Sequence, residues 1–395
     1  MNIRIMTWIQ YLGFITIGLI SGITGPIITA IRNDISMSYT QSGIIISGQF
    51  IGMFLVVIAG GYIADRFGKK LFLIVGSILL VIGLTGSMLS FNYIELLIFI
   101  VILGIGFGIY EIGINALCAD LSYTKKGKAM NYLHFFFGLG AIISLLLVTF
   151  SINVIKNWRF AFGIIIVLPL LISILLLNQK VIHNVSSAKS IKKEEIPFRN
   201  SFIWFAGIST FIYVGIEVSI YGWLPSFWVK LFPKSFIPAS LIAIVFWICL
   251  TSGRLFSGKI VDKIGFSKYL IITAGLTFII AFAWFLMPYK YLTLVSIALI
   301  GFTLSGIFPI IMASTTSFFP KITGIITGFI SIFASLGGLF IPTSIGYFAD
   351  YKGIKILPFI ILLMGILLVS TIFITWKILI RYNNIKLTIK NNLDF

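Results

Sequence analysis

Two stretches of this chain share one pattern: G-Y-I-A-D-R-F-G at residues 61–68 and G-K-I-V-D-K-I-G at residues 258–265. The two copies begin 197 residues apart, about half of the 395-residue length. Each copy therefore occupies the same place in one of two tandem halves. This spacing predicts an internal repeat, with the two halves folded alike.

Composition places both halves in a membrane. Hydrophobic residues make up 59% of the chain and charged residues 10%, whereas charged residues account for about a quarter of a soluble domain. A spanning helix needs about 20 apolar residues. We therefore predict an all-α membrane protein of two pseudo-symmetric six-helix bundles, with twelve transmembrane helices near 8–31, 41–64, 71–90, 94–118, 128–152, 159–178, 201–229, 237–258, 269–288, 291–314, 322–346 and 356–380. The first has no cleavable signal pattern and is expected to be retained.

The net charge of +18 is distributed unevenly along the chain. If the N-terminus is cytoplasmic, 21 of the 29 basic residues fall on the cytoplasmic side. This excess follows the positive-inside rule and predicts an integral protein of the cell (inner) membrane with both termini cytoplasmic. Anionic membrane lipid is a sufficient partner for the charge, so we expect no nucleic-acid partner.

A polar, basic stretch separates the halves. It predicts an N-terminal bundle over 1–179, a cytoplasmic linker over 180–200, and a C-terminal bundle with a short cytoplasmic tail over 201–395. The linker cannot bury an apolar face, so we interpret it as a tether; a regulatory or partner-binding role is the alternative. We expect a monomer.

No catalytic motif is present. Cys118 and Cys249 lie inside apolar spans, and His134 and His183 are too far apart in sequence to suggest a metal cluster. The chain has no P-loop, H-E-x-x-H or G-x-S-x-G pattern. We therefore predict neither an enzyme nor a metal or cofactor site, and any uphill movement of a solute must use an ion gradient or a partner.

Two acidic residues, Glu111 and Glu217, lie well inside apolar spans. An acid there costs about 2–3 kcal/mol on insertion scales, so each is a functional candidate. It can carry a proton or, when ionised, bind a cation. Asn115 lies one helical turn after Glu111 on the same face. The alternative for each acid is a structural hydrogen bond to a neighbouring helix.

Three further residues are candidates for the same cavity. Asn131 and His134 are three residues apart at the start of the fifth span, and His134 can titrate near neutral pH. Their nearness to Lys128 makes a structural role at the cytoplasmic end an open alternative. Trp223, near Glu217, could stack on the C–H face of a sugar, although aromatic residues also pack in cores and interfacial belts.

The repeated loop resembles the signature of the major facilitator superfamily, and the resemblance extends from about Tyr11 to Trp376. In that family G-x-x-x-D-R/K-x-G joins the second and third helices and recurs between the eighth and ninth. The resemblance implies a gating role for Gly61, Asp65, Arg66, Gly68, Arg254, Gly258 and Asp262. Charges that merely fix the topology are the alternative.

Other segments resemble the fucose-proton symporter family of sugar permeases: E-I-G-I-N at 111–115, N-Y-L-H-F-F-F-G-L-G-A at 131–141, Y-V-G-I-E-V-S-I-Y-G-W-L at 213–224, G-I-F-P at 306–309 and L-G-G-L-F-I-P-x-x-I-G-Y-F-A-D at 336–350. The resemblance implies an acid in the fourth helix, matched by Glu111. The family's acid in the first helix has no counterpart between Tyr11 and Ile31.

These observations predict a secondary active transporter that moves a small polar solute, a sugar from the resemblance, by proton- or sodium-coupled symport with alternating access. Glu111 would bind the proton or the solute, and Glu217 would be a second coupling carboxylate. Asn115 and Trp223 would contact the solute. Two alternatives stay open: proton-coupled efflux of drugs or metabolites, and a transporter-like sensor that moves nothing.

Overall fold

The computed structural model describes residues 3–121, 126–178, 200–319 and 323–393. Its N-terminal half comprises α1 (Ile3–Asp34), α2 (Tyr39–Phe67), α3 (Lys69–Leu89), α4 (Tyr93–Leu121), α5 (Lys126–Asn153), α6 (Arg159–Ile165) and α7 (Val167–Leu177). Its C-terminal half comprises α8 (Ser201–Leu231), α9 (Ala239–Ile264), α10 (Phe266–Leu286), α11 (Lys290–Leu304), α12 (Ile307–Phe318), α13 (Thr323–Lys352), the short η3 (Ile354–Ile356) and α14 (Leu357–Leu393).

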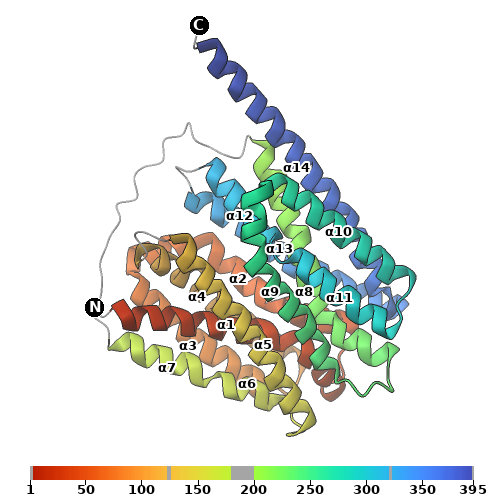
Figure 1. The fold of residues 1–395 in the computed structure, drawn as a ribbon. Coiled ribbons are helices and arrows are strands. Elements are labelled where there is room, and N and C mark those ends of the chain that lie inside the picture. The colour runs from red at the N-terminus through yellow and green to blue at the C-terminus, as the bar shows by residue number, and fades with distance from the viewer. Residues whose placement is uncertain (1–2, 122–125, 179–199, 320–322, 394–395) are drawn as a thin grey trace.

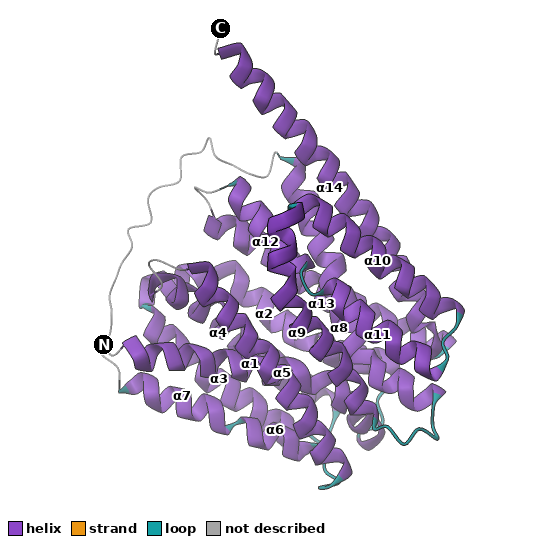
Figure 2. Cartoon of the chain, viewed as in Figure 1, coloured by secondary structure: helices purple, strands orange, loops and turns teal. Residues whose placement is uncertain are grey.

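The secondary structure of the described residues is helical throughout (Figure 2). Those residues contain twelve helical segments long and apolar enough to cross a membrane, six in each half. The prediction of an all-α membrane protein with twelve spans is therefore confirmed. The predicted linker lies outside the described residues except for Asn200, whose side chain caps the N-terminus of α8.

Two of the predicted spans are each divided into two helices, and in both a proline lies just after the break. Proline lacks the N–H that would bond to the carbonyl four residues earlier. Pro169 therefore leaves the carbonyl of Ile165 without its helical donor, and α6 ends at that residue. Pro309 does the same to Ser305, which follows the end of α11.

The outward faces of the bundle are apolar. In α3 the large side chains of Leu71, Ile78 and Ile82 are 52%, 51% and 43% exposed, while Ser77 on the same helix is fully buried and bonded to Tyr110. A soluble protein would place these groups the other way round. Because lipid solvates apolar side chains, this arrangement is that of an integral membrane protein.

The repeated loop forms the same turn in both halves. Gly68, between α2 and α3, has a φ of 87°, and Gly265, between α9 and α10, has a φ of 80°. Glycine has no Cβ and adopts these positive φ values without strain. The last glycine of each copy is therefore needed for a tight reversal between two spans.

The halves lie side by side and meet along α1 with α8, α2 with α13, and α5 with α9 (Figure 1). We name the end that carries the α1–α2, α8–α9 and α13–α14 connections the far end, and the opposite end the terminus end. At the far end, Thr29 Oγ1 and Ser226 Oγ are hydrogen bonded at 2.7 Å across a sequence separation of 197. This separation equals the repeat length, so equivalent residues of the two halves meet at their contact.

One turn earlier, Gly25 faces its own equivalent, Gly222. A Cβ on Gly25 would lie 2.7 Å from the Cα of Gly222 and closer still to the carbonyl oxygen of Tyr221. The two glycines therefore let α1 and α8 touch at their backbones. Self-matching contacts of this kind are expected where two equivalent units pack around a pseudo-two-fold axis.

Candidate functional site

A loose ion pair lies in the middle of the C-terminal half. Arg254 of α9 places Nη2 at 3.8 Å from Oε1 of Glu217 on α8. The separation is too long for a hydrogen bond. The two side chains are 21% and 13% exposed, so both retain access to space between the helices. Arg254, predicted from the sequence as a gating residue, thus lies beside a predicted coupling residue.

The N-terminal half contributes a histidine next to this pair. His134 of α5 lies within electrostatic range of Arg254, and its ring packs edge-on against Phe14 of α1 at 5.4 Å between ring centroids. Two predicted site residues, Glu217 and His134, therefore both lie near Arg254. The region lies where α8 and α9 face the opposite half.

Tyrosines lie one turn before and one turn after Glu217 on α8. The Tyr213 hydroxyl is buried within hydrogen-bonding range of both Glu217 and Arg254, yet it forms no hydrogen bond of good geometry with either. Tyr221 lies within electrostatic range of Glu217 and interacts with Ser21 of α1. Because residues four apart share a helix face, this face of α8 carries a hydroxyl, a carboxylate and a second hydroxyl in succession.

The facing side of α9 carries a matching polar stripe. Trp247, Thr251 and Arg254 follow the spacing i, i+4, i+7 and share one face. Trp247 Nε1, Thr251 Oγ1 and Arg254 Nε are all buried without hydrogen-bond partners. Unpaired buried polar groups are costly, and four of them, counting Tyr213, lie on the stretches of α8 and α9 that carry the ion pair. The cluster can supply hydrogen bonds to a polar ligand.

Glu111 lies in a second polar cluster, on α4. Its backbone carbonyl accepts a hydrogen bond from Asn115 Nδ2 at 2.8 Å, and its Oε1 accepts one at 3.3 Å. Among the described residues Glu111 forms no ion pair, and nothing links it to Glu217. Asn115 Oδ1 is buried and unpaired, as are Gln49 Oε1 of α2 and Gln10 Nε2 of α1. The N-terminal half therefore contains its own set of unpaired amides.

Trp223 lies in neither cluster. Its ring is fully buried, its Nε1 donates to the carbonyl of Pro342 on α13 at 2.9 Å, and its ring centroid is 6.0 Å from that of Tyr39 on α2. This conformation leaves Trp223 no free surface for a solute. The residue instead packs where α8, α13 and α2 close together at the far end.

Other contacts at the far end join the halves directly. Oδ1 and Oδ2 of Asp350, at the end of α13, accept hydrogen bonds from the backbone N–H groups of Tyr39 and Thr40, both at 2.8 Å. These N–H groups belong to the first turn of α2, where the helix dipole favours an anion. Thr343 of α13 also donates to Ser47 Oγ of α2 at 3.1 Å. We call this set, with Thr29, Ser226 and Trp223, the far-end gate.

The repeated loop is placed as expected in the chain, but its side-chain chemistry is outside the described residues. Gly61, Asp65 and Arg66 lie in the last turns of α2, and Asp262 lies near the end of α9. The side chains of Asp65, Arg66, Asp262 and the predicted site residue Asn131 are not described. A Cβ added to Gly258 would meet nothing within 4 Å, so this glycine is not required by packing.

Sequence reasoning missed Thr251 and Asp350. A signal existed for Thr251, because the polar stripe of α9 has helical spacing and includes Arg254. Asp350 ends the family-like segment 336–350, but nothing in the sequence pointed to its partners, which are more than 300 residues away in the chain. Only the packing of α13 on α2 brings them together.

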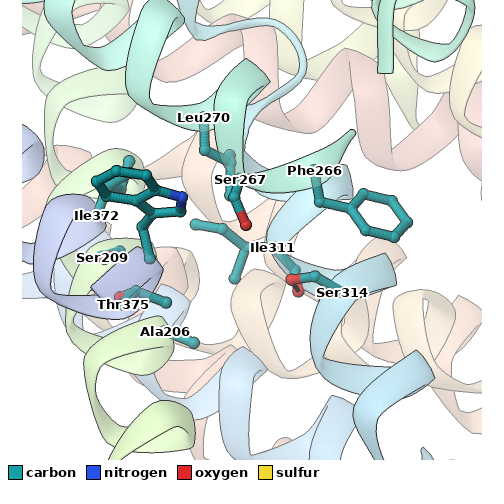
Figure 3. A pocket seen from close by; sticks show the side chains of 10 residues that line it. Ala206, Ser209, Phe266, Ser267, Leu270, Ile311, Ser314, Ile372 and Thr375 are labelled. Carbon is teal, nitrogen blue, oxygen red and sulfur yellow. Dashed lines mark hydrogen bonds between the residues drawn. The ribbon is translucent and has the colours of Figure 1, made fainter. Parts of the chain in front are cut away.

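No metal-binding cluster of histidine, cysteine and acidic side chains occurs among the described residues. Figure 3 shows a small cavity between α8, α10, α12 and α14, and its lining includes no residue of either polar cluster. It has room for about one water molecule, at about 10 Å³. Ser209, Ser267, Ser314 and Trp376 are among its lining residues. Its size excludes it as a solute site.

The sequence matches the family model described as Major Facilitator Superfamily over residues 11–342 and 239–388. The chain belongs to the major facilitator superfamily. It is therefore a membrane transporter by family, not an enzyme. The family resemblance seen in the repeated loop is confirmed.

Three curated relatives match most of this major facilitator chain. The glucose/mannose transporter GlcP of Bacillus subtilis is 24% identical over 91% of the chain and 92% of its own length. A hexuronate transporter of the same organism is 25% identical over 82% of each. The quinolone resistance protein NorA of Staphylococcus aureus is 24% identical over 87% of the chain and 89% of its own length.

Among solved structures, a D-xylose-proton symporter superposes with a TM-score of 0.81 over 96% of this chain and 98% of its own, at 18% identity. This similarity confirms the twelve-helix major facilitator fold.

Proposed function

We propose that this transporter moves a small polar solute, a sugar, by proton- or cation-coupled symport with alternating access. The observation that carries the proposal is the Glu217–Arg254 pair, which lies inside the membrane among unpaired hydrogen-bonding groups and faces the opposite half. Buried charges and unpaired donors are costly, and a site that binds a polar solute explains both. The sugar-transporting relative supports the solute class.

The roles follow from position. Glu217 is the coupling carboxylate of the C-terminal half, because its charge is balanced by only one distant partner. Glu111, hydrogen bonded to Asn115, is the proton or solute site of the N-terminal half. His134 is the residue of the N-terminal half that approaches Arg254. Asp65 and its loop act on the conformational exchange and not on the solute.

Alternating access requires that one end close while the other opens. The excess of basic residues assigns the terminus end to the cytoplasm. The far-end gate then closes the path to the outer face of the membrane. In this conformation the solute site would be reached from the cytoplasmic face. We propose that the protein works in the cell membrane as a monomer, with anionic lipid around its basic inner loops.

Sidedness can be tested with single cysteines in a chain whose Cys118 and Cys249 are replaced by serine. Cysteines at Ser187 and Asn392 should resist an impermeant thiol reagent in intact cells. A cysteine at Ser36, exposed in the far-end α1–α2 connection, should react. Labelling of the first two and protection of Ser36 would reverse the assignment.

Transport itself is tested by counterflow in proteoliposomes, across a panel of neutral and acidic sugars, with and without a proton or sodium gradient. Uptake of one sugar that is accelerated by a gradient supports symport. Silence toward every sugar, with or without either gradient, contradicts it.

Efflux is the second candidate, and the similarity to NorA favours it. An antiporter would expel lipophilic cations or quinolones when a proton gradient is imposed. The same proteoliposomes, loaded with a fluorescent cation in place of sugar, distinguish the two functions. A chain that moves neither would be a non-transporting sensor, a role that gives the buried acids no use.

A further inference from the structure

The guanidinium of Arg254 has unused binding capacity. It carries five N–H donors and no acceptor. Its Nη2 approaches Glu217 only to 3.8 Å, and its Nε is buried with no partner. Guanidinium groups bind carboxylates through two parallel hydrogen bonds at about 2.7–2.9 Å. The observed pair is far from that geometry, so Arg254 is free to take a better anionic partner.

The unpaired groups around Arg254 are biased toward donors. Trp247 Nε1 can only donate, and the hydroxyls of Tyr213 and Thr251 can donate. Glu217 is the single formally charged acceptor among them. A neutral sugar offers donors and acceptors in similar number, whereas a carboxylate offers acceptors alone. The excess of donors therefore fits a ligand that carries a carboxylate.

Aromatic rings line the same region from both halves. The ring centroid of Trp247 is 5.6 Å from that of Tyr221 on α8 and 6.0 Å from that of Phe137 on α5. Aromatic rings present flat apolar surfaces next to polar tips. In this conformation the rings of Trp247 and Tyr221 are buried, so a sugar ring would stack on them only after α5 and α8 separate beside Arg254. Arg254 and its neighbours suit a charged substituent on that ring.

We propose that the solute is a sugar acid, whose carboxylate binds Arg254 in place of Glu217 when Glu217 has taken up the coupling proton. The proposal rests on the symport function above. Protonation of Glu217 forms an O–H bond and ends its ion pair, so the positive charge of Arg254 becomes available. One proton and one carboxylate then cross together with no net charge. Loss of the proton on the other side restores the pair and expels the anion.

The surrounding charges permit this exchange. The titratable and charged groups that face the pair are Tyr213 and Tyr221 of α8, Arg254 itself on α9, and His134 of α5. Among the other helices packed on α8, α12 carries no charge, and the charges of α1, α11 and α13 lie at or near the helix ends. Those of α14 begin at Lys377, at the end of the membrane-spanning segment Ile354–Ile378. Among the side chains that the structure describes, Glu217 is the one carboxylate ion paired with Arg254, so its protonation leaves the positive charge of Arg254 unpaired within that set.

Binding to the purified, full-length protein tests the ligand class, with D-glucuronate and D-glucose as probes and calorimetry or tryptophan fluorescence as the readout. We expect glucuronate to bind at least about tenfold more tightly than glucose, as a charge-assisted bidentate contact allows. Arg254→Lys should weaken glucuronate binding by a similar factor, because lysine cannot form the planar pair. Arg159→Lys is the matched control: Arg159 is ion paired with Asp34 at the far end, and its substitution should leave binding unchanged.

Glu217→Gln tests independently whether the carboxylate of the solute replaces Glu217 at Arg254. It tests the proposal even if Arg254→Lys fails to fold. Wild-type affinity for glucuronate should fall as pH rises, because the ionised Glu217 competes for Arg254. The variant mimics the protonated acid, so its affinity should stay high across the same pH range. A variant that keeps the wild-type pH dependence would overturn the exchange.

The probes also separate this inference from the proposed function. Binding of glucose at least as tight as that of glucuronate, unaffected by Arg254→Lys, would overturn the sugar-acid inference and leave neutral-sugar symport standing. Binding of neither sugar, together with binding of a quinolone, would overturn both.

Discussion

Two polar regions lie inside this apolar molecule: the far-end gate and a central cluster that comprises Tyr213, Glu217, Trp247, Thr251 and Arg254. They differ in how fully their polar groups are paired. At the gate, Asp350 accepts two backbone N–H groups, Thr29 pairs with Ser226, and Trp223 donates to Pro342. In the centre, Tyr213, Trp247, Thr251 and Arg254 each leave a polar atom unpaired.

This difference in hydrogen bonding indicates that the two regions have different functions. A fully paired contact lowers the free energy of the conformation that forms it, because nothing else can satisfy those groups as well. An unpaired cluster raises the free energy of the empty protein and is relieved by a ligand. We infer that the gate holds one conformation of the cycle and that the centre responds to what is bound.

The largest expected effect is at Glu111, because its substitution should remove the coupling that the N-terminal half contributes. Glu111→Gln keeps the size of the side chain but mimics the protonated acid permanently. Gradient-driven accumulation of the solute should fall to the level that Glu217 alone supports, while counterflow exchange persists. Uptake and counterflow in the same proteoliposomes measure both. Full pH-dependent accumulation by a well-expressed variant would remove Glu111 from the coupling mechanism, and loss of both activities would make it a solute ligand.

A smaller effect is expected where the halves touch at the gate. Gly25→Ala places a methyl group against the backbone of Gly222 and Tyr221, so the far end cannot close fully. The maximal rate of transport should fall roughly tenfold, the equivalent of about 1.4 kcal/mol in the closed state, with solute affinity nearly unchanged. The control is Gly275→Ala in α10, where a Cβ meets nothing within 4 Å. A normal rate in Gly25→Ala would show that close contact of α1 and α8 is dispensable.

The smallest effect is expected at Asp350. Asp350→Asn removes the charge that caps α2, and a charge at a helix N-terminus contributes about 0.3–1 kcal/mol. The far end should open about two- to fivefold more often. A cysteine at Thr29, in the chain without native cysteines, reports this opening as its rate of reaction with a thiol reagent.

Asp34→Asn is the matched control for that measurement. Asp34 lies at the same end, but it pairs with Arg159 and Trp158 within the N-terminal half. It should not change the labelling rate at Thr29. Equal rates in all three proteins would show that the cap on α2 does not hold the gate closed.

The repeat predicted the fold well because folding in a membrane depends on local sequence. Each span satisfies its own backbone hydrogen bonds, so length and apolarity are enough to find it. Pro169 and Pro309 lie just after the breaks in two spans, which is an equally local feature. The positive φ values of Gly68 and Gly265 follow from the motif itself.

The ion-paired residues, unlike the helices, are not repeated in the two halves. Shifted by 197 residues, the positions of Glu217 and Arg254 correspond to Ile20 and Val57 in the N-terminal half. The ion pair therefore exists once, although the fold occurs twice. Its residues are 37 positions apart in sequence, and no spacing rule joins α8 to α9 at this depth.

The sequence alone determined the twelve helices, their division into two equivalent halves, and the presence of costly acids at Glu111 and Glu217. The tertiary structure decided which groups meet: Arg254 with Glu217 and His134, Asp350 with α2, and Trp223 with Pro342. The physical reason is the separation in sequence over which each kind of interaction acts. Helix formation depends on hydrogen bonds between residues four apart, whereas these contacts depend on how preformed helices from distant parts of the chain pack together.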